Sequence, residues 1–302
     1  MIGLGKNFTK PYQSKFAVDY RGRVVHDSRR MALDAKPRSR SRESQQGVQS
    51  SIQIADQYRK QLVKLINEMN HSIDYWLTAK FKKTENQREL INPTLAFDTA
   101  AEELQKALNQ LKKRWNSKFN QMAIELARYF SRSVASRSDI ELKKILKKGG
   151  MSVEFKMTAP MREALSAIVH ENVQLIKSIP QEYLGRIEQA TMRSVAAGRD
   201  LHQLYQDIQK TYQLTKKRAE LIARDQNFKA TGQLQKVRFQ ELGIEEAIWR
   251  HSHAGREPRP SHVKNDGQRY KVSTGWFDPE VKQHITPGFL INCRCYSVPV
   301  LP

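Results

Sequence analysis

Residues 101–130 read AEELQKALNQLKKRWNSKFNQMAIELARYF, and this stretch sets the expected fold class of the chain. Its large apolar side chains recur at steps of three or four residues: Leu104, Leu108, Leu111, Trp115, Phe119, Met122, Leu126 and Phe130. That spacing places them on one stripe of an α-helix, with polar residues on the other faces. The stretch therefore predicts a long amphipathic helix, whose stripe packs within the chain or against a neighbouring subunit.

The segment before this helix, from about residue 51, shows the same period. Its stripe consists of Leu62, Leu65, Ile66, Met69, Ile73, Trp76 and Leu77. Asn92-Pro93 separates the two helices, because proline has no backbone N–H for the helical hydrogen bond. A third, shorter helix is expected at 140–146, since the basic residues and glycines of 147–150 are typical of a helix end. We assign residues 51–150 to long amphipathic helices.

Residues 151–243 are expected to form a second helical region. Met151 to Met157 alternates apolar with other residues and predicts one short strand. Thr158 and Pro160 then predict a helix start, with threonine as the cap. Helical pieces are expected at 160–178, 180–197, 200–212 and 215–231, separated at Pro180, Gly198 and Gly232.

The last segment, residues 244–302, differs in composition from the helices. It holds six of the eleven prolines, both cysteines and four of the eight histidines. Asn265-Asp266-Gly267-Gln268 has the chemistry of a tight hairpin turn. The expected fold class is therefore mainly α, with a small loop-rich α+β module at the C-terminal end.

The charge balance of the chain points to an acidic partner. Among 302 residues, 52 Lys and Arg face 31 Asp and Glu, for a formal net charge of +21. Nucleic acid is the first candidate partner and an anionic membrane surface the second, while a basic surface can also serve solubility or docking on an acidic protein. We expect no membrane span and no secretory signal, since no stretch approaches about 20 apolar residues.

Residues 1–50 are strongly basic, with eleven Lys and Arg against four Asp and Glu. Within the run 36–42, basic residues alternate with small ones, and no large apolar residue is present to bury. We expect a flexible or partner-ordered arm that neutralises phosphates. Its candidate DNA-binding residues are Lys36, Arg38, Arg40 and Arg42.

The two cysteines lie in Cys293-Arg294-Cys295, and the same module contains His251, His253, His262 and His284. Thiolate and imidazole are the ligands that zinc prefers, and about four of them are needed. The candidate metal ligands are His262, Cys293 and Cys295, which could be completed by another of these histidines. The alternative is two buried free cysteines in a short terminal strand, with no cofactor.

An enzyme was considered on the basis of His262 together with Asp266, Arg256 and Arg259. A histidine beside a carboxylate and two cations is the minimum for a nuclease or phosphotransferase. The sequence has no second carboxylate cluster to hold Mg²⁺ and no phosphate-binding fingerprint. We therefore favour structural roles for these residues and assign no catalytic residue.

An ordered set of motifs in the C-terminal third resembles the Mu F-like family of phage head morphogenesis proteins, also called minor head or minor capsid proteins. It starts with Ala223-Arg224-Asp225-Gln226 and Gly232, where the family usually has Ala-Arg-Thr-Glu followed by glycine. The other matching residues are Trp249, Arg259, His262, Asp266, Gly267, Pro287, Gly288, Asn292, Cys293, Arg294 and Cys295. On this resemblance, residues 151–243 are a helical Mu F-like core and 244–302 the Mu F-like module. Some relatives have Cys-x-x-Cys at the positions of Arg259 and His262 and resemble metal binders.

The resemblance implies a structural protein of the virion, located inside the capsid near the portal and made in the host cytoplasm during assembly. Its implied partners are the portal protein, the major capsid protein and double-stranded DNA bound without sequence specificity. Several copies around the portal are expected, with roles in head morphogenesis and in genome packaging or ejection. The alternative is a metal-dependent nuclease or toxin-like effector that uses the His/Cys cluster.

Overall fold

The computed structural model describes residues 42–43, 46–88, 93–197, 201–254 and 257–301. Three of the candidate DNA-binding residues, Lys36, Arg38 and Arg40, lie outside these ranges, as does most of the basic arm. Arg42 lies in a short strand, and its side chain is not described.

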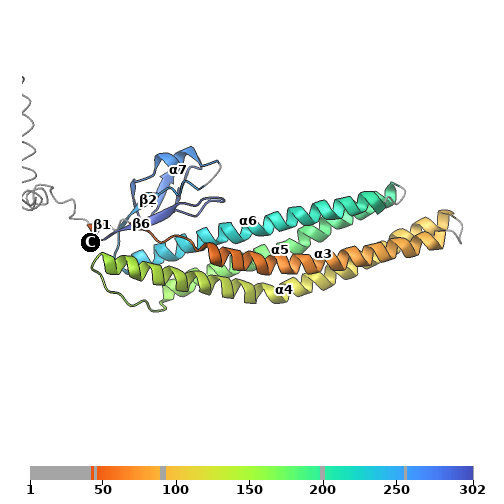
Figure 1. Cartoon of the computed structure of the whole chain (residues 1–302), viewed down its shortest axis with the longest axis horizontal. Coiled ribbons are helices and arrows are strands. Elements are labelled where there is room, and N and C mark those ends of the chain that lie inside the picture. Colours follow the sequence, from red (N-terminus) through yellow and green to blue (C-terminus); the bar gives the residue numbers. More distant parts are fainter. Residues whose placement is uncertain (1–41, 44–45, 89–92, 198–200, 255–256, 302) are drawn as a thin grey trace, which may run out of the picture.

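Four long antiparallel helices form an elongated bundle, with the C-terminal module at one end (Figure 1). The bounds of these helices are Ile52–Arg88 for α3, Pro93–Lys148 for α4, Ala159–Ala196 for α5 and Leu201–Glu241 for α6. Each helix packs against the next in chain order, and α6 closes the ring against α3. The mainly α fold class with a small C-terminal module is confirmed. Among the described helices, none combines the length and hydropathy that a bilayer crossing requires.

The apolar stripes predicted for the first two helices form the centre of the bundle. Every stripe residue of α4 from Leu104 to Phe130 is buried or half-buried, and Phe130 stacks on Tyr58 of α3 at 4.4 Å between ring centroids. Trp76 was predicted on the α3 stripe but is 44% exposed. It directly precedes the buried Leu77, so it points about 100° away from the stripe in a helix with 3.6 residues per turn.

The helices are longer and fewer than the sequence predicts. The helix expected at 140–146 is the last part of α4, and the four pieces between 160 and 231 are two continuous helices. Pro180 is buried inside α5, and Gly232 lies inside α6. A proline removes one hydrogen bond and a glycine costs about 1 kcal/mol, and both losses are outweighed here by packing along the whole helix.

The connector from 149 to 158 is extended and pairs with no strand, so the strand predicted at 151–157 is wrong. Its side chains still alternate, and the half-buried Met151, Val153 and Phe155 pack on the core of the C-terminal module. The predicted helix start is confirmed, because the Thr158 hydroxyl accepts a hydrogen bond from the Met161 backbone N–H.

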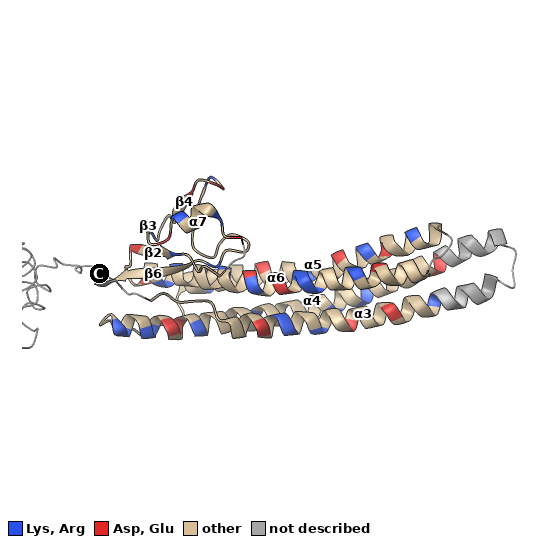
Figure 2. Cartoon of the chain, turned by 45° about the horizontal axis from the view of Figure 1, so that its top comes forward, with Lys and Arg blue, Asp and Glu red and all other residues tan. Residues whose placement is uncertain are grey.

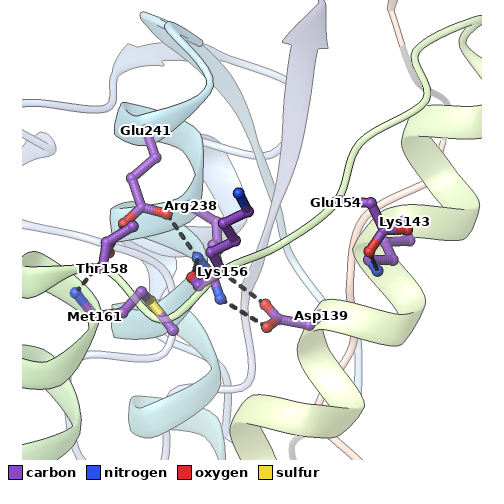
Figure 3. Close-up of polar contacts among 8 residues, drawn as sticks. All are labelled: Asp139, Lys143, Glu154, Lys156, Thr158, Met161, Arg238 and Glu241. Atoms are coloured by element: carbon purple, nitrogen blue, oxygen red, sulfur yellow. Dashed lines mark hydrogen bonds and ion pairs between the residues drawn. The ribbon is translucent and has the colours of Figure 1, made fainter.

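A buried arginine fastens this connector to two helices (Figure 3). The Arg238 guanidinium of α6 is almost completely buried and donates two hydrogen bonds to the Asp139 carboxylate of α4, at 2.9 and 2.7 Å. It also donates to Glu241 and to the Lys156 carbonyl in the connector. Burial alone would lower the pKa of Arg238, but the hydrogen bonds to Asp139 and Glu241 raise it, so the arginine stays charged.

The C-terminal module consists of short strands and one short helix. Their bounds are Glu246–Arg250 for β2, Pro260–Lys264 for α7, Arg269–Lys271 for β3, Trp276–Asp278 for β4, Gln283–Ile285 for β5 and Tyr296–Leu301 for β6. A four-stranded antiparallel sheet has the order β1-β6-β2-β3, where β1 is Arg42–Glu43, and β4 pairs with β5 separately.

The hairpin predicted at 265–268 is instead a turn from α7 into β3. Its Gly267 has φ +80°, and its N–H donates to the Trp249 carbonyl. The strands β2 and β3 do pair, but α7 lies between them in the chain. A helix end and a hairpin both use Asn-Asp-Gly for left-handed backbone, so composition alone does not separate them.

The fold begins before residue 50, within the segment that the sequence assigns to the arm. Strand β1 pairs with β6, and Val48 is buried in the module core. The Val48 carbonyl accepts a hydrogen bond from the Gln235 side chain of α6 at 2.7 Å. The structure therefore links residues 42–43 and 46–50 to the C-terminal module and to α6.

Candidate metal centre

Three of the predicted site residues, His262, Cys293 and Cys295, meet at the centre of the module. His262 lies on α7, which begins at Pro260, a residue suited to a first helical turn. The two cysteines lie on the extended segment that leads into β6. Both thiols are buried, while Arg294 between them is half-buried.

The ligand atoms of these three residues lie within 4.8 Å of one another. The His262 Nδ1 is 3.5 Å from the Cys293 sulfur and 3.6 Å from the Cys295 sulfur. Both cysteines are free and buried. Among the described residues, this is the group of His, Cys, Asp and Glu side chains that could hold a metal ion.

Asp278 fixes the other side of the His262 ring. Its Oδ2 lies 3.2 Å from His262 Nε2, and the two side chains are 0% and 3% exposed. The Glu280 backbone N–H donates to the Asp278 Oδ1 at 2.9 Å. Nothing in the sequence singled out Asp278, because 16 residues separate it from His262 and β4 brings it back.

Two tryptophan rings pack against the His262 side of the cluster. Trp249 of β2 meets the His262 ring edge-on, at 5.0 Å between centroids, and Trp276 meets it at 6.0 Å. Trp249 is completely buried and also contacts Tyr270 and Trp276. The motif tryptophan is thus the packing partner of the motif histidine.

The two buried thiols shift each other's pKa in opposite directions. The hydrogen bond with Cys295 lowers the pKa of Cys293 to about 4, against the opposing effect of burial, and His262 lowers it further. The hydrogen bond with Cys293 and burial raise the pKa of Cys295. A lowered pKa favours the thiolate, the form that binds metals.

A pocket of about 200 Å³ opens directly onto the cluster. Its lining includes all three cluster residues together with His251, Arg259 and Arg294. Both arginines brace loops at its rim, because Arg259 donates to the Ile291 carbonyl at 3.0 Å and Arg294 to the Ala254 carbonyl. The pocket is therefore lined by the thiols and imidazole of the cluster and by two arginines and one carboxylate, Glu257.

The His262–Asp266 pair considered for acid–base chemistry is not formed. Asp266 accepts hydrogen bonds from the His251 backbone N–H at 3.0 Å and lies 3.4 Å from the His253 ring. His262 instead uses one ring nitrogen toward Asp278 and the other toward the thiols. His284 is exposed on β5 against Phe277 and lies outside the cluster.

The remaining motif residues attach the module to α6. Arg224 donates to the Asn292 side chain at 2.9 Å, and Asp225 accepts from the Asn292 backbone N–H at 2.6 Å. Asn292 has φ +63° and directly precedes Cys293. Burial raises the pKa of Asp225, whereas the bond from Asn292 lowers it. These contacts hold the loop that carries the first thiol.

Two motif glycines allow α6 to approach the loop at 287–288. A Cβ on Gly232 would lie 2.3 Å from the Pro287 carbonyl oxygen, and one on Gly288 would lie 2.7 Å from the Phe228 carbonyl oxygen. Gly288 also has φ +83°. Backbone-to-backbone contact at these distances leaves no room for a side chain.

The protein is thus a four-helix bundle that carries a small module with a buried Cys/His cluster. In the comparisons with known proteins, residues 185–298 match the family described as phage Mu protein F like protein. The chain is also 35% identical over 154 residues to an uncharacterized protein of Haemophilus influenzae, a match that covers 50% of this chain and 32% of the relative. The chain thus spans about a third of that relative's length. No solved structure matches.

Proposed function

We propose that the protein is a minor component of a phage head that takes part in head assembly. The observation that carries the proposal is the Mu F-like match of residues 185–298. The structure supports it because the motif residues occupy two definite places, the attachment to α6 and the centre of the module. The family resemblance therefore rests on a folded unit and not on scattered residues.

The proposed location is the capsid interior around the portal, in several copies, after assembly in the host cytoplasm. An elongated bundle is suited to lie along a ring of portal subunits or to reach the major capsid protein (Figure 1). The proposed functions are in head morphogenesis and in genome packaging or ejection. Portal protein and major capsid protein are the proposed protein partners.

Packaged double-stranded DNA is the proposed acidic partner. The net charge of +21 supports it, and on the described helices Lys and Arg alternate with Asp and Glu (Figure 2). The arm also has an excess of positive charge, with eleven cations against four anions. Lysine and arginine contacts to phosphates release counterions without reading sequence, so binding should weaken steeply with salt.

Co-purification with the neighbouring head proteins tests these partners. Full-length chain and a variant without residues 1–41 are compared across a salt series; the deletion stops before β1 and removes none of the described elements. A matched variant replaces only Lys36, Arg38 and Arg40 by glutamine. We expect salt-resistant recovery of portal protein with all three chains, and DNA recovery that falls with salt and with loss of the arm. Recovery of DNA without any portal protein would contradict the proposal.

Incubation with plasmid and divalent metal tests the enzymatic alternative. The His262 side chain is 3% exposed and both of its ring nitrogens face other side chains, so the structure does not favour it as a base for DNA hydrolysis. We expect the protein to retard plasmid without cutting it. Cutting that disappears in His262→Ala would overturn the structural function.

A further inference from the structure

We propose that His262, Cys293 and Cys295 bind a zinc ion through three protein ligands, with the fourth position open to a small anion from the adjoining pocket. The proposal concerns the module alone, and it is independent of the function in head assembly. It rests on the separations of the ligand atoms, their burial, the carboxylate behind His262 and the pocket in front of it.

The distances within the cluster match a tetrahedral zinc site. Zinc lies about 2.3 Å from thiolate sulfur and about 2.0–2.1 Å from imidazole nitrogen, so a sulfur and a nitrogen on the same ion stand about 3.5 Å apart. The His262 Nδ1 stands 3.5 and 3.6 Å from the two sulfurs. All three ligand atoms lie within 4.8 Å of one another, as a shared ion requires.

The surroundings of the cluster are those of a metal site. Two soft sulfurs and one imidazole favour zinc over the oxygen-seeking Mg²⁺ and Ca²⁺. Asp278 lies 3.2 Å from His262 Nε2, and a carboxylate in this position directs the lone pair of the other ring nitrogen toward a metal. Removing the ion would leave a buried histidine, carboxylate and thiol pair in an apolar pocket of tryptophans.

The fourth position faces the pocket and not another protein ligand. All three ligands line the pocket of about 200 Å³, and so does His251. The His251 Nδ1 lies 3.3 Å from the His253 Nδ1, and His251 is not part of the group within 4.8 Å. Arg259 and Arg294 line the same pocket and outnumber its one carboxylate, Glu257, so an anion is the ligand that this opening would attract.

Metal content of the purified full-length chain is the first test. We expect about one zinc per chain by elemental analysis after dialysis, and the loss of that zinc with a strong chelator. Cobalt is then loaded in place of zinc, since its visible and near-ultraviolet bands report tetrahedral geometry and thiolate ligands. Absence of zinc together with failure to bind cobalt would overturn the proposal without any variant.

Variants assign the ligands. Cys293→Ser, Cys295→Ser and His262→Gln should each weaken zinc binding by at least tenfold, and the two serine variants should lower the thiolate band. His284→Gln is the matched control, because His284 lies in the same module but on exposed β5. Equal zinc binding by the folded ligand variants and the control would contradict the ligand assignment.

Azide added to the cobalt-loaded chain tests the open position. We expect its visible bands to shift at millimolar azide, and to do so also in His251→Ala. If azide leaves the visible bands of the wild type unchanged, or if His251→Ala does not retain cobalt, the fourth ligand is a side chain. Either result would contradict the open position.

Discussion

The helical bundle and the C-terminal module are stabilised in different ways. The bundle buries one continuous stripe along each of four helices, so its core consists of many similar aliphatic contacts. The module has a smaller core, in which Trp249 contacts both Tyr270 and Trp276 and which also contains two buried cysteines. The stability of the bundle is therefore distributed over many residues, whereas the stability of the module depends on a few.

Buried polar groups contribute to both regions. In the bundle, Tyr58 donates to Asn172 at 3.0 Å, and Asn172 donates to Gln226 at 3.0 Å, which links three helices. Such neutral pairs fix how the helices align, and the buried ion pair of Arg238 with Asp139 joins α6 to α4. In the module, the ionisable pair of His262 and Asp278 is buried at the centre.

The largest expected effect is that of Trp249→Ala. Trp249 is completely buried and contacts His262, Tyr270 and Trp276, so its removal leaves a cavity at the centre of the module. We expect a loss of about 3–5 kcal/mol in the free energy of unfolding. Denaturant unfolding followed by fluorescence and by helical circular dichroism measures it. The matched control is Trp76→Ala on α3, which should cost about 1 kcal/mol or less. Equal losses in both variants would show that the two regions do not differ as described.

The clamp at Arg238 should give the next largest effect. Arg238→Met leaves the carboxylates of Asp139 and Glu241 without their cation, at a place where they are about one-quarter exposed or less. We expect a loss of about 3 kcal/mol and faster proteolysis of the connector at 149–158. Arg137→Met is the control, since Arg137 pairs with Glu141 while half exposed, and it should cost at most about 1 kcal/mol. An Arg238 variant as stable as the control would mean that the clamp contributes little.

Two glycine-to-alanine variants test the contact between α6 and the module against a position on the surface of the bundle. Gly232→Ala places a methyl group 2.3 Å from the Pro287 carbonyl oxygen, so α6 and the loop must separate. We expect a loss of about 1–3 kcal/mol by thermal or urea unfolding. Gly185→Ala in α5 has nothing within 4 Å and should stabilise the chain by about 0.5–1 kcal/mol. Effects of the same sign in both variants would contradict the close contact of α6 with the module.

The smallest expected effect concerns Glu188 on α5. Hydrogen bonds from Lys112 and Gln105 of α4 lower the pKa of Glu188 below its usual value of 4.5. A lowered pKa in the folded state stabilises the protein above the unfolded pKa, and this contribution is lost as pH falls through the folded value. The free energy of unfolding of the wild type should therefore be higher than that of Glu188→Gln by less than about 1 kcal/mol at pH 7. This difference should shrink below about pH 4.5. Urea unfolding at several pH values measures it, and a difference that does not change with pH would contradict the assignment.

Local pattern predicted the helices well, and their joins poorly. The stripe from Leu104 to Phe130 is enough to identify α4, because a helix buries one face whatever lies against it. The breaks expected at Pro180 and Gly232 are absent, since tertiary packing overrides the local cost of either residue. The strand expected at 151–157 failed for the related reason that alternation shows which side chains point inward, but not whether a neighbouring strand is available.

For the candidate site, the sequence identified the three residues that meet in the cluster but not their arrangement. His262, Cys293 and Cys295 were singled out because of their chemistry, and the structure brings them together. Asp278 was missed and Asp266 was considered in its place, although Asp266 lies next to His251 and His253. Neither aspartate carries a local signal, so only the fold could choose between them.

The sequence by itself determined the apolar stripes, the basic excess and the residue types at the site, because periodicity, charge and ligand chemistry are properties of the chain in any conformation. Only the tertiary structure decided which carboxylate lies behind His262, that Arg238 clamps the connector, and that Gly232 meets the loop at Pro287. Each of these contacts joins residues far apart in the chain, and their separation is set by how the helices and strands pack.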